Sequence, residues 1–192
     1  MQIERWQRSG LNLPVSVNIG VHHLHQTDFV ARLREMLANH PEIKPDGLEF
    51  ELLESSAMGD LDHVSGVIQE CRQLGIKFAL DDFGTGYSLL TCLKKLPVAQ
   101  LKIDQRFVRE MRSDPSDLAI VTSMVGLART IGIDVIAEGV ETLEEGAALL
   151  KVECELGQGY AIAHPMPAAE LPLWVKDWKP DPAWATVKPR PR

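Results

Sequence analysis

The sequence lacks the features that would place it in a membrane or outside the cell. No window approaches the ~20 consecutive apolar residues that a membrane-spanning helix needs. The opening residues, MQIERWQRSG, carry charges where a signal peptide has an apolar run. Only three cysteines are present, without CxxC spacing, so we expect buried thiols in a reducing compartment rather than a disulfide framework. We therefore expect a cytoplasmic location and no membrane segment within this chain.

An excess of positive charge is also missing. The formal net charge is -7, which argues against binding to a nucleic-acid polymer, because such binding needs a basic face. A phosphate-bearing ligand remains open, since clustered carboxylates can hold divalent cations that then meet the phosphate. The 192 residues, 45% of them hydrophobic, suit one sizeable core rather than two domains.

Short apolar runs separated by longer amphipathic stretches predict a parallel sheet with crossover helices. The predicted strands are residues 15–19, 48–54, 77–83, 100–104, 134–140 and 158–163. Most are continuously apolar, as parallel strands covered on both faces are. The predicted helices are residues 27–39, 60–74, 116–131 and 142–152. Asp60 and the capping box of Thr142 with Glu145 mark helix starts, and Gly75 and Gly132 mark helix ends.

This alternation predicts an α/β fold, either doubly wound or a barrel. Residues 3–9 resemble the last turns of a helix that ends at Gly10. A closed barrel has eight strands, so we expect an incomplete (β/α)8 TIM-like barrel of about six parallel βα units, with two strands upstream. Residues 179–192 hold four prolines and turn basic, so we expect one domain over 1–178 and a disordered or extended tail over 179–192.

Polar residues lie near the C-terminal ends of the predicted strands, where barrels build active sites. They are Asn18, Glu51, Glu54, Asp81, Asp82, Lys102, Asp104 and Glu138, with Gln158 opening the last strand. A helix-capping role explains a single Asp or Asn. It does not explain Glu51, Lys102 or Glu138, which lie within apolar strand sequence, where an unpaired charge is costly. We therefore expect one convergent site.

The residue types at these positions suit hard cations. Oxygen donors without neighbouring His or Cys favour Mg²⁺ or Mn²⁺ over zinc. Several carboxylates on one rim can hold two cations roughly 3.5–4 Å apart, an arrangement that cleaves phosphodiesters. The adjacent Asp81 and Asp82 suit different ions, and Lys102 can orient the attacking water or stabilise developing charge. The residues alone predict metal-assisted hydrolysis, or binding, of an anion.

Six motifs in order resemble those of the EAL phosphodiesterase family, across about residues 11–170. They are VNIG (17–20), LEFELLES (48–55), DDFGTGYSLL (81–90), LKID (101–104), AEGVET (137–142) and QGYAIAHPMP (158–167). The resemblance implies a modified (β/α)8 barrel that hydrolyses cyclic-di-GMP to linear pGpG with Mg²⁺ or Mn²⁺.

The resemblance also implies a role for each matching residue. The implied metal ligands are Asn18, Glu51, Asp81 and Asp82, with Asp81 shared between two ions. The implied catalytic set is Lys102, Glu138, Asp104 and Glu54, of which Glu54 holds the DDFGTGYS loop; Gln158 and Pro165 are the implied substrate contacts. In this family that loop borders a dimer interface, so a homodimer is implied. Exposed barrel edges offer a second route to self-association.

The sequence departs from the family pattern at several positions. Leu53, Leu89 and His164 stand where the family usually has Thr, Ser and Arg. No Glu-x-Leu segment precedes VNIG, although the family takes a first-metal glutamate from such a segment. We expect an active phosphodiesterase in the parent protein and impaired hydrolysis by this chain alone. The alternative is a non-catalytic cyclic-di-GMP receptor or a protein-interaction module of the same fold.

Overall fold

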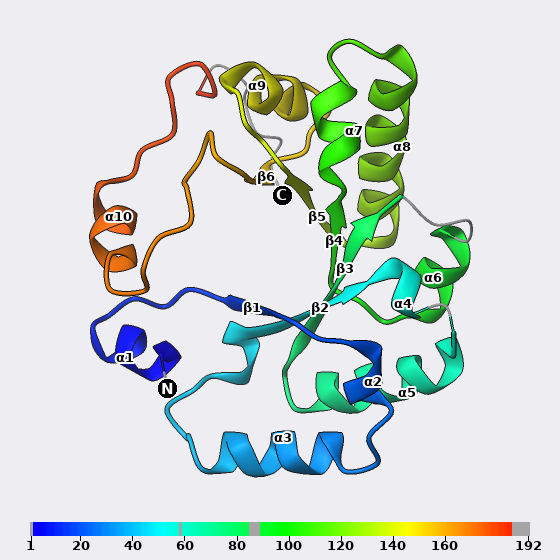
Figure 1. Ribbon diagram of the computed structural model, residues 1–192, viewed down its shortest axis with the longest axis vertical. Helices are drawn as coiled ribbons and strands as arrows, with labels where there is room; N and C mark the ends of the chain where they lie inside the picture. Colours follow the sequence, from blue (N-terminus) through cyan, green and yellow to red (C-terminus); the bar gives the residue numbers. More distant parts are fainter. Residues whose placement is uncertain (1, 58, 85–88, 186–192) are drawn as a thin grey trace. The chain divides into compact units, whose positions relative to one another are not determined.

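The chain divides into two compact units, Met1–Ala99 and Gln100–Arg192. The computed structural model describes residues 2–57, 59–84 and 89–185 (Figure 1). Each unit holds three parallel strands with helices between them. The predicted alternation of about six parallel βα units is therefore confirmed.

Unit 1 is built on strands β1, β2 and β3. Its elements are α1 (Gln2–Arg8), β1 (Val15–Asn18), α2 (Val21–Leu24), α3 (Phe29–Ala38), the 3-10 helix η1 (Pro45–Gly47), β2 (Leu48–Leu53), α4 (Glu54–Ala57), α5 (Leu61–Gln73), β3 (Lys77–Phe83) and α6 (Leu89–Lys95). β2 lies between the other two strands, with Val15 opposite Leu48 and Glu49 opposite Lys77. As predicted, the Asp60 side chain caps α5, accepting a hydrogen bond from the backbone N–H of His63.

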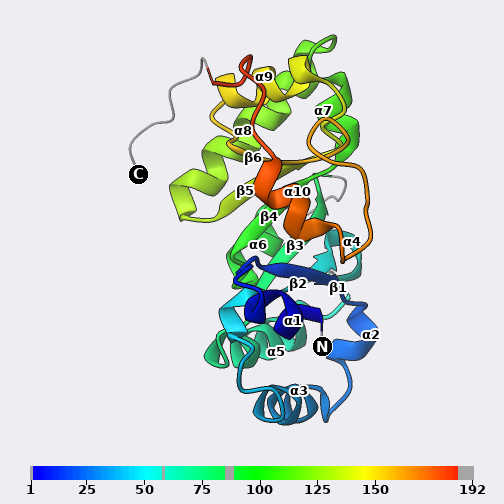
Figure 2. The ribbon, with the colours of Figure 1, turned by 90° about the vertical axis from the view of Figure 1, so that its left-hand side faces the viewer.

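One face of the unit 1 sheet carries the apolar core. The rings of Phe50 and Phe78 pack edge to face, with their centroids 5.4 Å apart. The ring centroid of Phe29 on α3 lies 6.1 Å from that of Phe50. Helix α5 packs on α3 and on β3, with Val64 and Ile68 fully buried (Figures 1 and 2). Because side chains alternate along a strand, residues 49, 51 and 53 of β2 point to the opposite face.

Unit 2 repeats the arrangement with β4, β5 and β6. Its elements are β4 (Gln100–Ile103), α7 (Gln105–Glu110), α8 (Pro115–Ile131), β5 (Asp134–Glu138), α9 (Leu143–Lys151), β6 (Leu156–Gln158) and α10 (Leu171–Asp177). Helix α8 packs on β5 and α7 and ends at Gly132, whose φ of 74° is the left-handed stop expected there. The capping box of Thr142 and Glu145 starts α9 as predicted.

Two differences from the predicted element boundaries affect predicted site residues. The strand predicted over 158–163 is wrong: β6 is Leu156–Gln158, and residues after it turn, with the N–H groups of Ile162 and Ala163 both donating to the carbonyl of Gly159. Gln158 therefore ends a strand instead of opening one. Glu54 lies outside β2, as the first residue of α4. A short apolar run does not by itself distinguish a strand from a turn, which explains the first difference.

The three cysteines are free and buried, as expected for core thiols. Burial raises the pKa of Cys71 and of Cys154 to about 11, so neither is a ready nucleophile at neutral pH. No helix among the described residues is long and apolar enough to cross a membrane. In the predicted tail, Trp184 donates its indole N–H to the carbonyl of Leu143 at 2.9 Å, and residues 186–192 lie outside the described part.

Candidate active site

In unit 1, neighbouring strands place Asn18 and Glu51 side by side, because these residues are register partners of β1 and β2. The Glu51 side chain points away from the phenylalanine core, and only 9% of this residue is exposed. Asp81 is the register partner of Leu53, so it lies on the same face as Glu51 and one step further toward the strand end. One amide and two carboxyl groups therefore line the C-terminal edge of this sheet.

The backbone of β3 departs from regular strand geometry at Asp82. Asp82 has φ 53°, a left-handed conformation that costs a non-glycine residue about 1–3 kcal/mol. The N–H of Gly84 donates to Oε2 of Glu54 at 3.0 Å, and Glu54 is completely buried. Glu54 therefore anchors the start of the DDFGTGYS segment. Residues 85–88, on which the predicted dimer loop depends, lie outside the described residues.

The donor chemistry of this edge fits a hard divalent cation. Asn18 supplies an amide oxygen, and Glu51, Asp81 and Asp82 supply carboxylates; no His or Cys occupies these positions. Mg²⁺ and Mn²⁺ prefer such oxygen ligands. The left-handed backbone at Asp82 is a conformation that often persists where side chains are arranged for binding.

In unit 2, a buried ion pair joins two strand ends. Nζ of Lys102 on β4 lies 2.7 Å from Oε1 of Glu138 on β5, and the two side chains are 4% and 18% exposed. Lys102 is the register partner of Ile136, and Glu138 is the partner of Gln158 on β6. Three neighbouring strands of unit 2 thus bring Lys102, Glu138 and Gln158 to one face near the strand ends.

Asp104 follows β4 directly and caps α7. It accepts a hydrogen bond from the backbone N–H of Arg106 at 2.7 Å, and the Arg106 guanidinium meets both carboxylate oxygens, with Nη2–Oδ2 at 2.9 Å and Nε–Oδ1 at 3.1 Å. Burial alone raises the pKa of Asp104, but these hydrogen bonds and the positive charge of Arg106 outweigh it and hold that pKa below its ordinary value. Asp104 is therefore a fixed, ionised carboxylate beside the lysine strand.

The loop after β5 is held tightly against α7. Gly139 has φ 67°, and a Cβ atom at this position would lie 2.4 Å from Cβ of Gln105. Only glycine fits both the backbone angle and this approach. An ion pair between Arg109 of α7 and Glu141 adds a second connection. These contacts fix the strand end that carries Glu138.

The segment after β6 carries the remaining predicted residues. The ring of His164, where the family usually has Arg, stacks on the ring of Tyr160 at 4.2 Å. Pro165 follows directly. Arg106 and Tyr160 were not among the residues predicted for the site. The available signal for Arg106 was its position two residues after Asp104, which caps a helix. Nothing in the sequence indicated the stacking of Tyr160 on His164.

These features define a parallel α/β protein with acidic and amide oxygens at the strand ends of one unit and a buried lysine–glutamate pair at those of the other. The EAL domain family model matches residues 1–165. The chain belongs to the EAL domain family.

The chain is similar to several characterised relatives. It is 39% identical over 176 residues to the cyclic di-GMP phosphodiesterase PdeR of Escherichia coli, covering 91% of this chain and 26% of PdeR. It is 36% identical over 171 residues to the bifunctional diguanylate cyclase/cyclic di-GMP phosphodiesterase MucR of Pseudomonas aeruginosa, covering 88% of this chain and 25% of MucR. The chain therefore spans about a quarter of the length of these relatives.

Solved structures share the fold. The EAL domain of Mycobacterium smegmatis DcpA matches with a TM-score of 0.86 at 33% identity, over 93% of this chain and 81% of that one. The manganese/cy-diGMP complex of Klebsiella pneumoniae BlrP1 matches with a TM-score of 0.78 at 33% identity, over 85% of this chain and 42% of that one. The predicted fold class, an incomplete (β/α)8 barrel, is confirmed by this similarity to EAL domains.

Proposed function

We propose that this chain carries the metal-binding and catalytic residues of a phosphodiesterase that hydrolyses cyclic-di-GMP to linear pGpG. The observation that carries the proposal is the arrangement of Asn18, Glu51 and Asp81, oxygen donors that share one sheet edge in unit 1. PdeR is a cyclic di-GMP phosphodiesterase, and a solved form of BlrP1 holds manganese with the dinucleotide.

Unit 1 would hold two Mg²⁺ or Mn²⁺ ions. Asn18, Glu51 and Asp81 would bind the first ion, and Asp81 and Asp82 the second. Such ions lower the pKa of a bound water and offset charge on the phosphate when they are present. Glu54 would keep the backbone from Asp82 to Gly84 in place by accepting a hydrogen bond from the N–H of Gly84.

Unit 2 would supply a positioned cation and its counter-charge. Glu138 fixes the Lys102 ammonium through their 2.7 Å contact, so the ammonium loses little conformational entropy when the substrate binds. From there it would hold the attacking water and stabilise charge that develops on phosphate. Asp104, fully engaged by Arg106, keeps a fixed negative charge beside the lysine strand. Gln158 and Pro165 would contact the substrate.

We also propose that the active form is a homodimer, through the DDFGTGYS region or through exposed strand edges. Impaired hydrolysis by these 192 residues alone stays an expectation from the sequence. Cytoplasmic location stays a prediction.

The test is a chromatographic assay of cyclic-di-GMP conversion to pGpG with Mn²⁺, comparing this chain with a version extended upstream. We expect the extended version to convert the substrate and a Glu138→Gln variant of it to lose the activity. Tight binding without conversion by the extended version would instead favour the receptor alternative. Robust conversion by the 192 residues alone would refute the expected impairment.

A further inference from the structure

We propose that residues 178–185 form a strap that positions Glu138 by holding the first turn of helix α9, and that Trp184 is the positioning residue of this strap. The strap, α9 and Glu138 all belong to unit 2. The strap follows α10 and lies beyond residues 1–165, the part of the chain that matches the EAL family model. The inference rests on the proposed role of Glu138 in hydrolysis.

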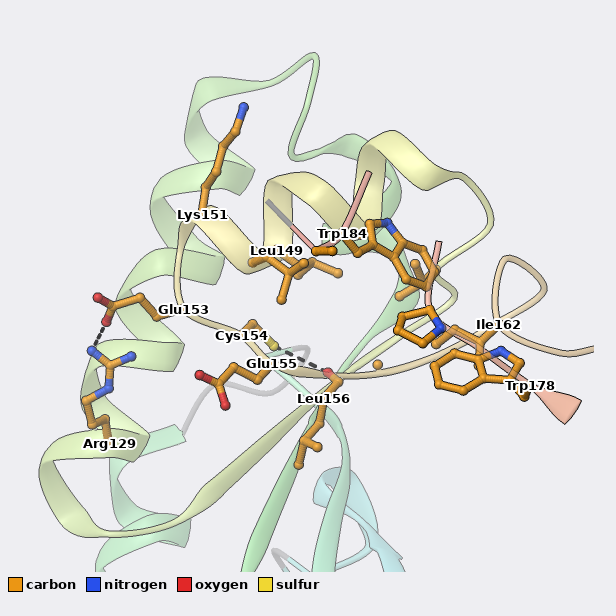
Figure 3. A pocket seen from close by; sticks show the side chains of 16 residues that line it. Arg129, Leu149, Lys151, Glu153, Cys154, Glu155, Leu156, Ile162, Trp178 and Trp184 are labelled. Carbon is orange, nitrogen blue, oxygen red and sulfur yellow. Dashed lines mark hydrogen bonds and ion pairs between the residues drawn. The ribbon is translucent and has the colours of Figure 1, made fainter. Parts of the chain in front are cut away.

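The Trp184 side chain docks on the first turn of α9. Figure 3 shows the indole beside the yellow helix α9, on the same side of a pocket as Trp178. The indole N–H donates to the carbonyl of Leu143, the first residue of α9, at 2.9 Å. A Cβ atom at Gly146 would lie 2.6 Å from Nε1 and 2.7 Å from Cε2 of the indole. Glycine weakens a helix interior, so the close approach of the indole gives a physical reason for glycine at this position.

The strap has local structure that orients the indole. The carboxylate of Asp181 accepts a hydrogen bond from the N–H of Ala183 at 2.8 Å, and the Asp181 carbonyl accepts one from the N–H of Trp184 at 2.9 Å. Pro180 and Pro182 flank Asp181 and restrict the backbone on both sides. A segment that is ordered in this way loses less conformational entropy when its side chain docks.

The first turn of α9 is connected in turn to the loop that follows β5. Oε2 of Glu145, a buried residue, accepts hydrogen bonds from the N–H groups of Glu141 and Thr142 at 2.8 and 2.9 Å. Oγ1 of Thr142 accepts a hydrogen bond from the N–H of Glu145 at 3.2 Å. Because Leu143 and Glu145 lie in the same helical turn, the indole that holds Leu143 also steadies the carboxylate that holds the loop.

The same loop fixes the end of the strand that carries Glu138. Glu138 lies three residues before Glu141, and its carboxylate is 2.7 Å from Nζ of Lys102. A shift of the loop would therefore move a carboxylate whose action depends on its orientation, and misplacement by about 1 Å can lower a rate by about 10²-fold. Loss of the Trp184 contact leaves the contacts of the loop with α7 in place, so we expect a smaller effect of about tenfold.

The first test measures the loop directly, by hydrogen exchange of the 192-residue chain resolved at single amides by NMR. Trp184→Phe keeps an aromatic ring but removes the donor to Leu143. We expect the N–H groups of Glu141 and Thr142 to exchange about tenfold faster than in the unchanged chain, because the first turn of α9 opens more often.

Trp178→Phe is the matched control. Trp178 lies in the same strap, and its ring packs on Trp174 of α10, a contact that phenylalanine keeps in part. This variant should leave the exchange of Glu141 and Thr142 within about twofold of the unchanged chain. Unchanged exchange in Trp184→Phe, or equal acceleration in both variants, would overturn the proposal.

Gly146→Ala tests the same contact from the helix side. The added methyl group would collide with the indole and displace it, so exchange of the Glu141 N–H should again rise by about tenfold. In a Trp184→Ala chain the same alanine should cause no further rise, since no indole is left to displace. Effects that add in the double variant would mean that the two positions act separately, and would contradict the docked strap.

The second test is kinetic and uses the upstream-extended protein. We expect Trp184→Phe to lower kcat for cyclic-di-GMP hydrolysis by about tenfold and to change KM by less than about twofold, because it disturbs a group of the chemical step. A rise in KM with unchanged kcat would contradict a positioning role toward Glu138. If the unchanged extended protein does not hydrolyse cyclic-di-GMP, the proposed function fails, and the exchange rates alone decide whether the strap holds the loop.

Discussion

Units 1 and 2 share one architecture but differ in the charged groups at their strand ends. Each has three parallel strands with polar residues where the strands end. Unit 1 gathers carboxylates there, on Glu51, Asp81 and Asp82. Unit 2 places Lys102 against Glu138. Like charges brought together on one edge repel, whereas the buried pair of unit 2 neutralises itself.

This difference indicates two different tasks. A set of oxygen donors of one sign is arranged for a cation that comes from outside the chain. A buried lysine with its own counter-charge keeps its ammonium group in one orientation, since the ion pair fixes the ammonium before any ligand binds. Under the proposed function, unit 1 would bind the metal ions and the buried pair of unit 2 would act on the substrate.

The largest effect should come from Glu138→Gln. In the upstream-extended protein we expect hydrolysis of cyclic-di-GMP to fall by about 10²–10⁴-fold, the range for losing a group that acts on proton transfer. Mn²⁺ affinity, measured by calorimetry on the same preparation, should change less than twofold. A parallel loss of Mn²⁺ affinity would place Glu138 among the metal ligands and end the assignment of separate tasks.

Removing the cation of the buried pair should cost stability. Lys102→Met leaves Glu138 largely buried without this partner, and breaking a buried pair costs about 3–5 kcal/mol. Urea unfolding followed by circular dichroism gives the free energy of unfolding. The control is Lys77→Met at the exposed start of β3 in unit 1, which should change that energy by about 0.5 kcal/mol or less. Similar losses in both variants would contradict a special role for the Lys102 pair.

A smaller loss is expected from Gly139→Ala, which tests how firmly unit 2 holds the strand end of Glu138. The added methyl would meet Gln105 Cβ in a left-handed backbone, and we expect a loss of about 2 kcal/mol in the free energy of unfolding. Gly126→Ala in α8 is the control, since no atom lies within 4 Å of its Cβ position. That control should gain about 0.5–1 kcal/mol from better helix propensity. Tolerance of alanine at 139 would show that the loop is not fixed by this contact.

The smallest effect concerns Asp104 and depends on pH. Because its pKa is lowered in the folded state, Asp104 contributes stability that is present above its ordinary pKa of 3.8 and is lost as pH falls through the lowered value. Arg106→Ala should remove about 1 kcal/mol at pH 7, a modest figure because the arginine side chain is largely exposed. The two unfolding curves should converge below that pH window. A constant difference at all pH values would mean that Arg106 acts through packing alone.

The fold, and the strand-end positions of most predicted site residues, could be predicted because they depend on local rules. Glu51 and Lys102 stood out as charges inside apolar strands, and the caps at Asp60 and Thr142 followed from spacing. The prediction placed Gln158 at the start of its strand, but the structure places it at the end. Residues 161–163 (AIA) form a turn, although their composition also suits a strand. The Arg106 clamp and the Trp184 contact could not be predicted, since both depend on which long side chain reaches which partner in three dimensions.

The central claim is tested most directly by Mn²⁺ binding to the 192-residue chain, followed by electron paramagnetic resonance. Asp81→Asn and Lys102→Met are compared with the unchanged chain in one titration. We predict that Asp81→Asn weakens Mn²⁺ binding at least tenfold, because it removes a carboxylate from the unit 1 edge, while Lys102→Met leaves the affinity within twofold. Unchanged binding by Asp81→Asn, or an equal loss in both variants, would contradict the division between a metal-holding and a substrate-activating unit.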